Sequence, residues 1–265
     1  MRDIPPLTFA GLRYFLAFVC LLPFALTKER ISEIKKIDRK DWFRLTVLGL
    51  LFYTFTQGTQ FIGLSLLPAV TVSLLLNFTP IIVAVMGIFL LSEKPSTLQW
   101  LGASLFIVGI FTYFYPVDLP ESKTLGIIIM TIGVFSNAFS SVLGRGINRS
   151  SKFHPLTVTV VSMGIGSIVM LVIGLAIQGL PLLSLTNILF LLWLAVVNTA
   201  FAFTLWNLSL RTLTAMESSI INGTMLIQIA FLAWIFIGEP VTWKEGIGML
   251  IAAAGAAVVQ IKRRN

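Results

Sequence analysis

Polar side chains interrupt several long apolar stretches of this sequence, at spacings that place them on shared helix faces. Tyr53, Gln57 and Gln60 stand at i, i+4 and i+7, so a helix would carry all three on one face. In an apolar helix such side chains either face a water-filled path or hydrogen-bond neighbouring helices. If they face a water-filled path, these side chains could bind a small polar molecule reversibly. We expect a binding site lined by parts of the following set: Arg13, Tyr53, Gln57, Gln60, Asn77, Asn198, Trp206 and Asn222.

Two charged residues lie well inside apolar stretches. Arg13 could bind a carboxylate or phosphate group of a substrate, or carbonyl groups at a broken helix end. Glu217 stands three residues after Thr214, where it could couple a proton or simply extend to the membrane interface. Asn222 lies five residues further on, roughly opposite Glu217 at about 100° per residue. We therefore expect Asn222, the deeper of the two, to line the cavity.

Motifs of familiar enzymes are absent from the sequence. It has no Gly-Lys dipeptide, and hence no phosphate-binding loop for ATP, and no HExxH or G-x-S-x-G motif. Its one histidine, His154, and its one cysteine, Cys20, offer no metal cluster. We expect no catalytic residue, no metal and no cofactor.

The composition requires these residues to be held by membrane helices. Residues of the AVILMFWYC set make up 57% of the 265 residues and charged residues only 11%, which excludes a water-soluble domain. A spanning helix takes about 20 residues, so the sequence predicts an all-α, polytopic membrane protein with nine transmembrane helices. They lie near residues 7–26, 45–63, 67–91, 97–115, 125–146, 156–177, 186–208, 214–237 and 243–261.

Positive charge indicates the orientation. With nine helices, most of the 19 Lys and Arg residues fall in connections on one side of the membrane, and such an excess marks the cytoplasmic side. The C-terminus is then cytoplasmic and the membrane is the cytoplasmic (plasma) membrane. Because the basic residues occupy short loops, the net charge of +8 does not indicate nucleic-acid binding. The expected partners are the lipid bilayer and a small-molecule substrate.

An internal repeat divides the chain. An offset of 146 residues superposes Leu67 on Leu213, Ser73 on Ser219, Glu93 on Glu239 and Gly102 on Gly248. We expect a first repeat over 1–115, an external linker over 116–124 and a second repeat over 125–265.

The second repeat has one helix more than the first. Pro6-Leu7-Thr8 matches Pro155-Leu156-Thr157, and only the second half has a helix before that point. We therefore expect the complete protein to have ten helices, five in each half. An odd number of helices per repeat inverts one half relative to the other, an arrangement common in transporters. Duplication could instead have produced only a larger stable bundle.

Four segments resemble the signature regions of EamA-type domains in the drug/metabolite transporter superfamily. Arg13 with Tyr14 is similar to the arginine-aromatic pair in the second helix of that family. The resemblance implies ten helices in two repeats, a central cavity and export or exchange of small metabolites. The segments are Leu76–Ala84 with Leu91–Lys94, and Met225–Ile227 with Gly238–Pro240.

Another group of residues is expected to have a structural role rather than to bind substrate. A proline within a helix removes a hydrogen bond and can kink it, glutamates just past helix ends can cap or tether neighbouring helices, and glycines allow close helix contact within a monomer or a homodimer. The residues are Pro80, Glu93, Gly102, Gly109, Glu239, Gly248 and Gly255.

These observations together predict a secondary transporter, an exporter or exchanger of small amphipathic metabolites such as amino acids, that works by alternating access. The alternatives are a non-transporting membrane receptor or interaction subunit and, less favoured, an intramembrane enzyme.

Overall fold

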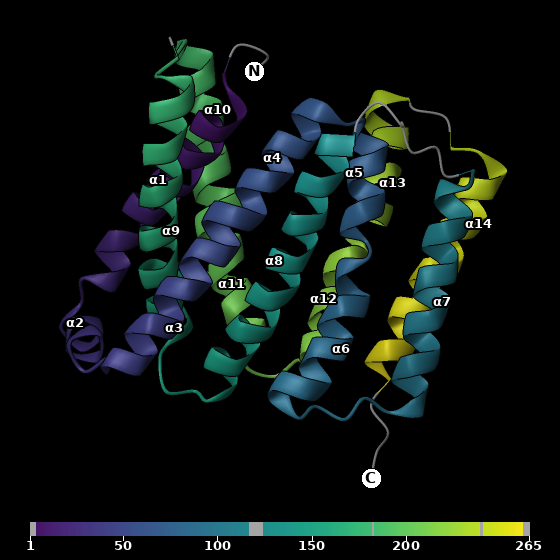
Figure 1. The fold of residues 1–265 in the computed structure, drawn as a ribbon, viewed down its shortest axis with the longest axis horizontal. Helices are drawn as coiled ribbons and strands as arrows, with labels where there is room; N and C mark the ends of the chain where they lie inside the picture. Colours follow the sequence, from purple (N-terminus) through teal and green to yellow (C-terminus); the bar gives the residue numbers. More distant parts are fainter. Residues whose placement is uncertain (1–3, 117–123, 182, 239–240, 262–265) are drawn as a thin grey trace.

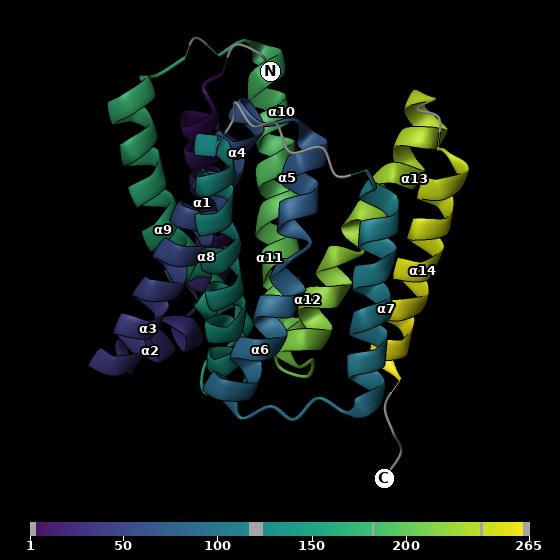
Figure 2. The same ribbon diagram turned by 45° about the vertical axis from the view of Figure 1, so that its right-hand side comes forward.

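The computed structural model describes residues 4–116, 124–181, 183–238 and 241–261, and every regular element in those ranges is a helix. The helices stand side by side in one bundle (Figures 1 and 2). They are α1 (Pro6–Ala25), α2 (Lys28–Lys35), α3 (Arg39–Gly49), η1 (Leu50–Thr56), α4 (Gln57–Leu66), α5 (Ala69–Leu76), α6 (Thr79–Leu91), α7 (Thr97–Phe114), α8 (Thr124–Arg149), α9 (Pro155–Gln178), α10 (Leu185–Ala195), η3 (Val196–Phe201), α11 (Ala202–Ser209), α12 (Ala215–Gly223), α13 (Met225–Ile237) and α14 (Trp243–Gln260).

Seven segments of the described chain are long and apolar enough to cross a membrane, which agrees with a multi-pass membrane protein. Two of the nine expected spans, 45–63 and 243–261, fall on helical segments that are not among these seven, because they are not apolar enough. Polar residues inside these spans explain the difference, because 45–63 contains Gln57, Gln60 and four threonines and α14 carries Lys244 and Glu245. Nine spans therefore stay a prediction.

Two segments contain π-helical turns at corresponding positions. η1 lies between α3 and α4, and η3 lies between α10 and α11; their first residues, Leu50 and Val196, are 146 residues apart. Each turn satisfies a carbonyl through a threonine side chain, because Thr56 Oγ1 donates to Leu51 O and Thr199 Oγ1 donates to Leu194 O, both at 2.8 Å. Such insertions into α-helices frequently occur at functional sites.

Two further spans are broken near their middles, again at corresponding positions. α5 ends before Asn77 and α6 begins at Thr79, while α12 ends at Gly223 and α13 begins at Met225. Pro80 lies in the first turn of α6, where its missing N–H is tolerated. α7 and α14, the helices that follow the two broken spans, also begin and end 146 residues apart.

α7 and α14 pack against each other through glycines. A Cβ atom on Gly102 would lie 2.7 Å from Gly255 O, and one on Gly109 would lie 2.7 Å from Gly248 O. The pairing runs antiparallel and is reciprocal under the 146-residue offset, because Gly102 corresponds to Gly248 and Gly109 to Gly255. An inverted repeat would produce such a reciprocal contact, and the repeat itself stays a prediction.

A second close antiparallel pair, α1 with α9, lies at the other side of the bundle (Figure 1). A Cβ on Gly11 would lie 2.6 Å from Leu171 Cα, and one on Gly174 would lie 2.8 Å from Thr8 N. The interior between the two pairs is filled by α3 with η1 and α4, by the two broken spans, and by α8 and α11.

The loop between α8 and α9 is held by charge to the start of α3. Lys152 Nζ donates to Asp38 Oδ2 at 2.9 Å and also pairs with Asp41. The backbone N–H of Asp41 and, after it, the Lys152 ammonium lower the pKa of Asp38. The hydrogen bonds to Asp41 and Asp38 raise the pKa of Lys152. Asp41 is also within 3.6 Å of Arg44, so four charged side chains, two acidic and two basic, lie together at this corner.

Glu33 of α2 holds the start of α9. Its carboxylate accepts hydrogen bonds from His154 N at 2.5 Å and from Thr157 Oγ1 at 2.6 Å, and it pairs with Arg30. Burial alone would raise the pKa of Glu33, but the hydrogen bonds from Thr157, His154 N–H and Arg30 outweigh it and lower that pKa. Burial and the nearby cations Arg30 and Arg211 lower the pKa of His154.

A buried ion pair at the same end joins α8 to the segment after α6 and, through two further hydrogen bonds, to the end of α11 and the start of α12. Arg145 Nε of α8 donates to Glu93 Oε1 at 3.2 Å, and Arg145 Nη1 donates to Leu210 O at 2.7 Å. The other oxygen of Glu93 accepts from Ala215 N, the first residue of α12, at 3.0 Å. All the ion pairs of the described residues lie at this end of the bundle.

The opposite end is joined mainly by uncharged groups in the described ranges. Gln178 Oε1 accepts hydrogen bonds from Leu7 N and Thr8 N at 2.9 and 3.3 Å. Lys244 Nζ lies 5.0 Å from the ring centroid of Tyr115. The bundle is thus tied by charge at one end and by weaker contacts at the other.

We expect Gly109→Ala to destabilise the protein, because its Cβ would lie 2.3 Å from Ala252 N and the two backbones would have to separate. Overpacking of this kind costs about 1–3 kcal/mol. Thermal unfolding in detergent would measure it. Gly246→Ala, in α14, is the matched control because nothing lies within 4 Å of its added Cβ; equal unfolding temperatures for the two variants would contradict the packing account.

The Glu33 contacts predict a pH-dependent contribution to stability. Because the pKa of Glu33 is lowered from its ordinary 4.5, its stabilisation is complete above that value and is lost as the pH falls through the folded-state pKa. Unfolding temperatures of the wild type and Glu33→Gln should therefore differ at neutral pH and converge in acid. A difference that persisted unchanged below pH 4.5 would contradict this assignment.

Candidate functional site

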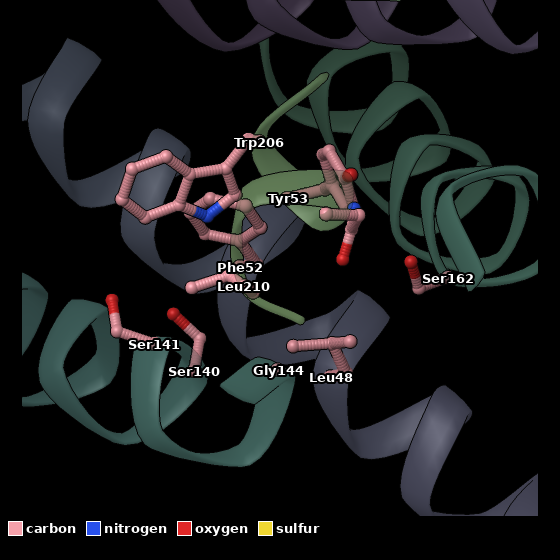
Figure 3. A pocket seen from close by; sticks show the side chains of 10 residues that line it. Leu48, Phe52, Tyr53, Ser140, Ser141, Gly144, Ser162, Trp206 and Leu210 are labelled. Carbon is pink, nitrogen blue, oxygen red and sulfur yellow. The ribbon is translucent and has the colours of Figure 1, made fainter. Parts of the chain in front are cut away.

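A small cavity lies between η1, α8, α9 and α11, near the middle of the bundle. Figure 3 shows the aromatic rings of Phe52, Tyr53 and Trp206 close together, with the hydroxyls of Ser140 and Ser141 on α8 and of Ser162 on α9 around them. The complete lining is Leu48, Phe52, Tyr53, Ser140, Ser141, Gly144, Ser162, Trp206, Asn207 and Leu210.

The π turn η1 supplies the aromatic wall. Phe52 and Tyr53 are consecutive in it, and their ring centroids are 5.2 Å apart. Both rings also contact Phe203, at 5.2 and 5.4 Å between centroids, and Tyr53 meets Tyr14 at 5.6 Å. Offset and edge contacts of this kind favour aromatic packing, so a rigid aromatic cluster backs the cavity.

The hydroxyl groups around the cavity differ in how they are satisfied. Ser140 Oγ donates to Asn137 O at 2.9 Å and Ser162 Oγ donates to Val158 O at 2.6 Å, which leaves both oxygens able to accept a further bond. Tyr53 is fully buried, and its hydroxyl lies beside Ser162 but makes no hydrogen bond of normal geometry to any described residue. An unmade bond of a buried hydroxyl is costly, and a bound polar molecule would relieve that cost.

Asn207 is fixed by a chain of side-chain hydrogen bonds across three helices. Its Nδ2 donates to Thr159 Oγ1 at 3.0 Å, and its Oδ1 accepts from Asn148 Nδ2 at 2.7 Å. All three residues are buried. This chain sets the position of α11, and therefore of Trp206, against α8 and α9.

Charge and size limit what the cavity can accept. None of the ten lining residues is acidic, basic or histidine, so its walls suit hydroxyl, amide and apolar groups. Its volume is about 10 Å³, enough for roughly one water molecule. A metabolite therefore requires the surrounding helices to move apart.

A second cavity, of about 40 Å³ on the same measure, lies between α6, α7 and α12. Its lining includes Pro80, Trp100 and Phe106 and is almost entirely apolar. Ser104 is its one hydroxyl residue and it has no amide side chain, whereas the first cavity has three serines, Tyr53 and Asn207. The first cavity is therefore the better candidate for a substrate site.

The first cavity contains only part of the expected site. It includes Tyr53 and Trp206, both expected, together with Phe52 and Asn207 and the serines of α8 and α9. The sequence signal for the serines is weak, because a serine in a membrane helix usually bonds to its own backbone. Adjacent serines at 140 and 141 in a long apolar helix are the one pattern that singles them out.

Arg13 and Asn198 lie together, away from that cavity. Arg13 Nε donates to Thr199 Oγ1 at 2.9 Å, and Arg13 Nη2 lies 3.5 Å from Asn198 O. These are groups of the π turn η3, so the geometry favours binding to a helix irregularity over binding to a substrate anion. The Asn198 side chain is exposed.

The remaining amides are spread over other elements. Asn77 is buried at the break between α5 and α6, where its Nδ2 donates to Ser73 O at 2.8 Å, and its Oδ1 lies 3.5 Å from where a Cβ on Gly223 would be. The two helix breaks therefore meet. Gln57 and Gln60 are half-buried on α4, and Asn222 is exposed on α12.

Glu217 lies in the first turn of α12 and caps the start of that helix. It forms a capping box with Thr214, in which Thr214 N donates to Glu217 Oε2 at 2.9 Å and Glu217 N donates to Thr214 Oγ1 at 3.2 Å. Gln99 Nε2 donates to its other oxygen at 3.0 Å. These bonds account for the carboxylate by helix capping, which the geometry favours over proton coupling.

The residues expected to act in the architecture lie at helix contacts, as described above for Pro80, Glu93 and the four glycines of α7 and α14. Glu239 lies outside the described residues.

Comparison with known proteins places this bundle in a family. The EamA-like transporter family matches residues 1–115 and 124–261. A solved crystal structure shares the fold with a TM-score of 0.79 and 14% identity, covering 97% of this chain and 89% of its own.

Curated relatives cover nearly the whole chain. The uncharacterized transporter YvbV of Bacillus subtilis is 28% identical over 98% of this chain and 84% of its own length. The uncharacterized transporter YoaV of the same organism is 24% identical over 96% and 87%. Protein PecM of Dickeya dadantii is 24% identical over 85% and 76%. With both parts of the family match spanning nearly the whole sequence, this chain belongs to the EamA-like transporter family and is a multi-pass membrane transporter.

Proposed function

We propose that the chain is a secondary transporter that exports or exchanges small amphipathic metabolites, such as amino acids, across the plasma membrane. The cavity at Tyr53 and Trp206 carries this proposal. It combines aromatic surface with serine hydroxyls, an asparagine amide and an unsatisfied tyrosine hydroxyl, the groups that an amphipathic solute would need. Family membership points away from an enzyme.

The proposed mechanism is alternating access between two inverted repeats, 1–115 and 125–265, joined by 116–124. Support comes from the π turns and helix breaks at the 146-residue offset and from the reciprocal antiparallel contact of α7 with α14. The cavity lies between the proposed repeats, because η1 belongs to the first and α8, α9 and α11 to the second. If the repeats exchange conformations, the cavity opens first to one side and then to the other.

The charged contacts around Lys152 would close one of these openings. They join residues 33–41 of the first proposed repeat to residues 152–157 of the second. The concentration of Lys and Arg at this end supports a cytoplasmic orientation for it and for the C-terminus. Opening toward that side requires the Lys152 and Glu33 contacts to break.

The first test is counterflow in proteoliposomes preloaded with a labelled metabolite library. The expected result is exchange of at least one amphipathic solute that empty liposomes do not show. Well-folded protein that moved no member of the library would favour a receptor or interaction subunit over a transporter.

For any solute that moves, Trp206→Ala should lower kcat/KM by about tenfold or more, since an aromatic contact between the half-buried Trp206 and the solute contributes more than about 1.4 kcal/mol. Initial rates over a concentration series measure it. Trp243→Ala is the matched control, because Trp243 is 87% exposed on α14. Equal losses in both variants would exclude a specific role of the Trp206 cavity.

Lys152→Ala should favour the state that is open at the charged end. A single cysteine at Ser141, which is buried in the cavity wall, reports this state in a background with Cys20, the only native cysteine, replaced by serine. A membrane-impermeant maleimide applied from the Lys152 side should label the Lys152→Ala protein several-fold faster. Lys94→Ala, an exposed lysine at the same end, should leave the rate unchanged. An unaltered rate in Lys152→Ala would contradict the closing role.

A further inference from the structure

α2 lies across the charged end of the bundle. Figure 1 shows this helix nearly end-on, whereas α1 and α3 run up the page. Ile34 packs on a buried cluster that contains Ile37 and Leu45, so α2 is fixed to the bundle. α2 follows the membrane-spanning helix α1 after two residues and precedes the apolar part of α3 by a short turn, which places it at the level of the lipid headgroups.

This segment presents a group of unpaired cations. Its five lysine and arginine side chains without an ion-pair partner among the described residues are exposed. They stand on α2, in the turn after it and in the first turn of α3, and we call them the basic platform. Its members are Lys28, Lys35, Lys36, Arg39 and Lys40.

The nearby acidic groups are mostly committed elsewhere. Asp38 and Asp41 pair with Lys152, and Glu33 binds Arg30 and the start of α9. Only Glu29 in this segment lacks such a contact among the described residues. The segment is therefore strongly positive after its internal pairs are formed.

Exposed apolar side chains adjoin these cations. Phe43 is 69% exposed, Trp42 is 39% exposed and Phe24, at the end of α1, is 66% exposed. Aromatic side chains at headgroup level anchor proteins at the membrane interface. A free phosphate or soluble metabolite would use the cations but not these apolar surfaces, whereas a phospholipid would use both.

We propose that the basic platform binds the headgroups of anionic phospholipids while Trp42 and Phe43 contact their acyl chains. Each Lys or Arg near an anionic membrane surface adds to the attraction for that surface. The platform therefore collects anionic lipid from a mixed bilayer. This binding is independent of whether any solute is transported.

The test uses the full chain in bilayers of phosphatidylcholine with a minority of phosphatidylglycerol, in which one lipid at a time carries brominated acyl chains. Bromine quenches tryptophan fluorescence at contact, and the Trp42 signal is the difference between the wild type and Trp42→Phe. Phosphatidylglycerol should quench Trp42 at least about threefold more than its share of the bilayer predicts. Quenching in proportion to the bulk composition would overturn the proposal.

Replacing the five cations of the basic platform by glutamine should return the quenching to the bulk proportion. Lys94→Gln, at the same end but in the connection between α6 and α7, is the control and should keep the enrichment. The proposal would also be overturned if the variant with all five cations replaced kept its helical circular dichroism spectrum and still enriched phosphatidylglycerol around Trp42. Inorganic phosphate that displaced the lipid more than chloride of equal ionic strength would assign the site to free anions instead.

Discussion

Each polar group that this chain carries into the bilayer must find its partner within the protein, because lipid tails offer none. Arg13 meets this requirement at the π turn η3, and Arg145 meets it with Glu93 and the Leu210 carbonyl. Asn207 meets it through Asn148 and Thr159. The positions of α1, α8 and α11 follow from these contacts, since moving any one of these helices alone would leave a buried polar group unpaired.

Several buried polar groups of the described residues depart from this rule, and the Tyr53 hydroxyl is the one of them that lines the candidate cavity. It is buried without a hydrogen bond of normal geometry in the cavity where aromatic rings and serine hydroxyls meet. The surrounding groups are held rigidly by ring contacts and by the asparagine chain. The cavity is uncharged and contains one buried hydroxyl without a hydrogen-bond partner among the described residues. Both features support the proposal that it binds and releases a polar solute.

The distribution of charge separates the two ends of the bundle. Ion pairs tie Glu33, Asp38 and Lys152 at one end, where they also lie outside the apolar spans and can exchange partners with water. The glycine contacts of α7 with α14 and of α1 with α9 involve backbone atoms and have no such alternative. Under the proposed mechanism, motion is expected at the charged contacts, with each close helix pair, one helix from each proposed repeat, moving as a unit.

The sequence by itself determined the helical, membrane-embedded class, the approximate limits of the helices and two residues of the candidate site. The expected span 97–115 is found as α7, Thr97–Phe114, because apolar composition and a Ser96 cap define a helix locally. Tyr53 was predicted because it shares a helix face with Gln57 and Gln60, and Trp206 because it stands beside Asn207 in an apolar stretch. The tertiary structure alone decided that Arg13 binds Thr199, that Glu217 receives Gln99 and that serines of α8 and α9 complete the cavity. Helix periodicity fixes which residues share a face, but the partner of that face depends on how the helices cross, and that is set by contacts between residues far apart in the chain.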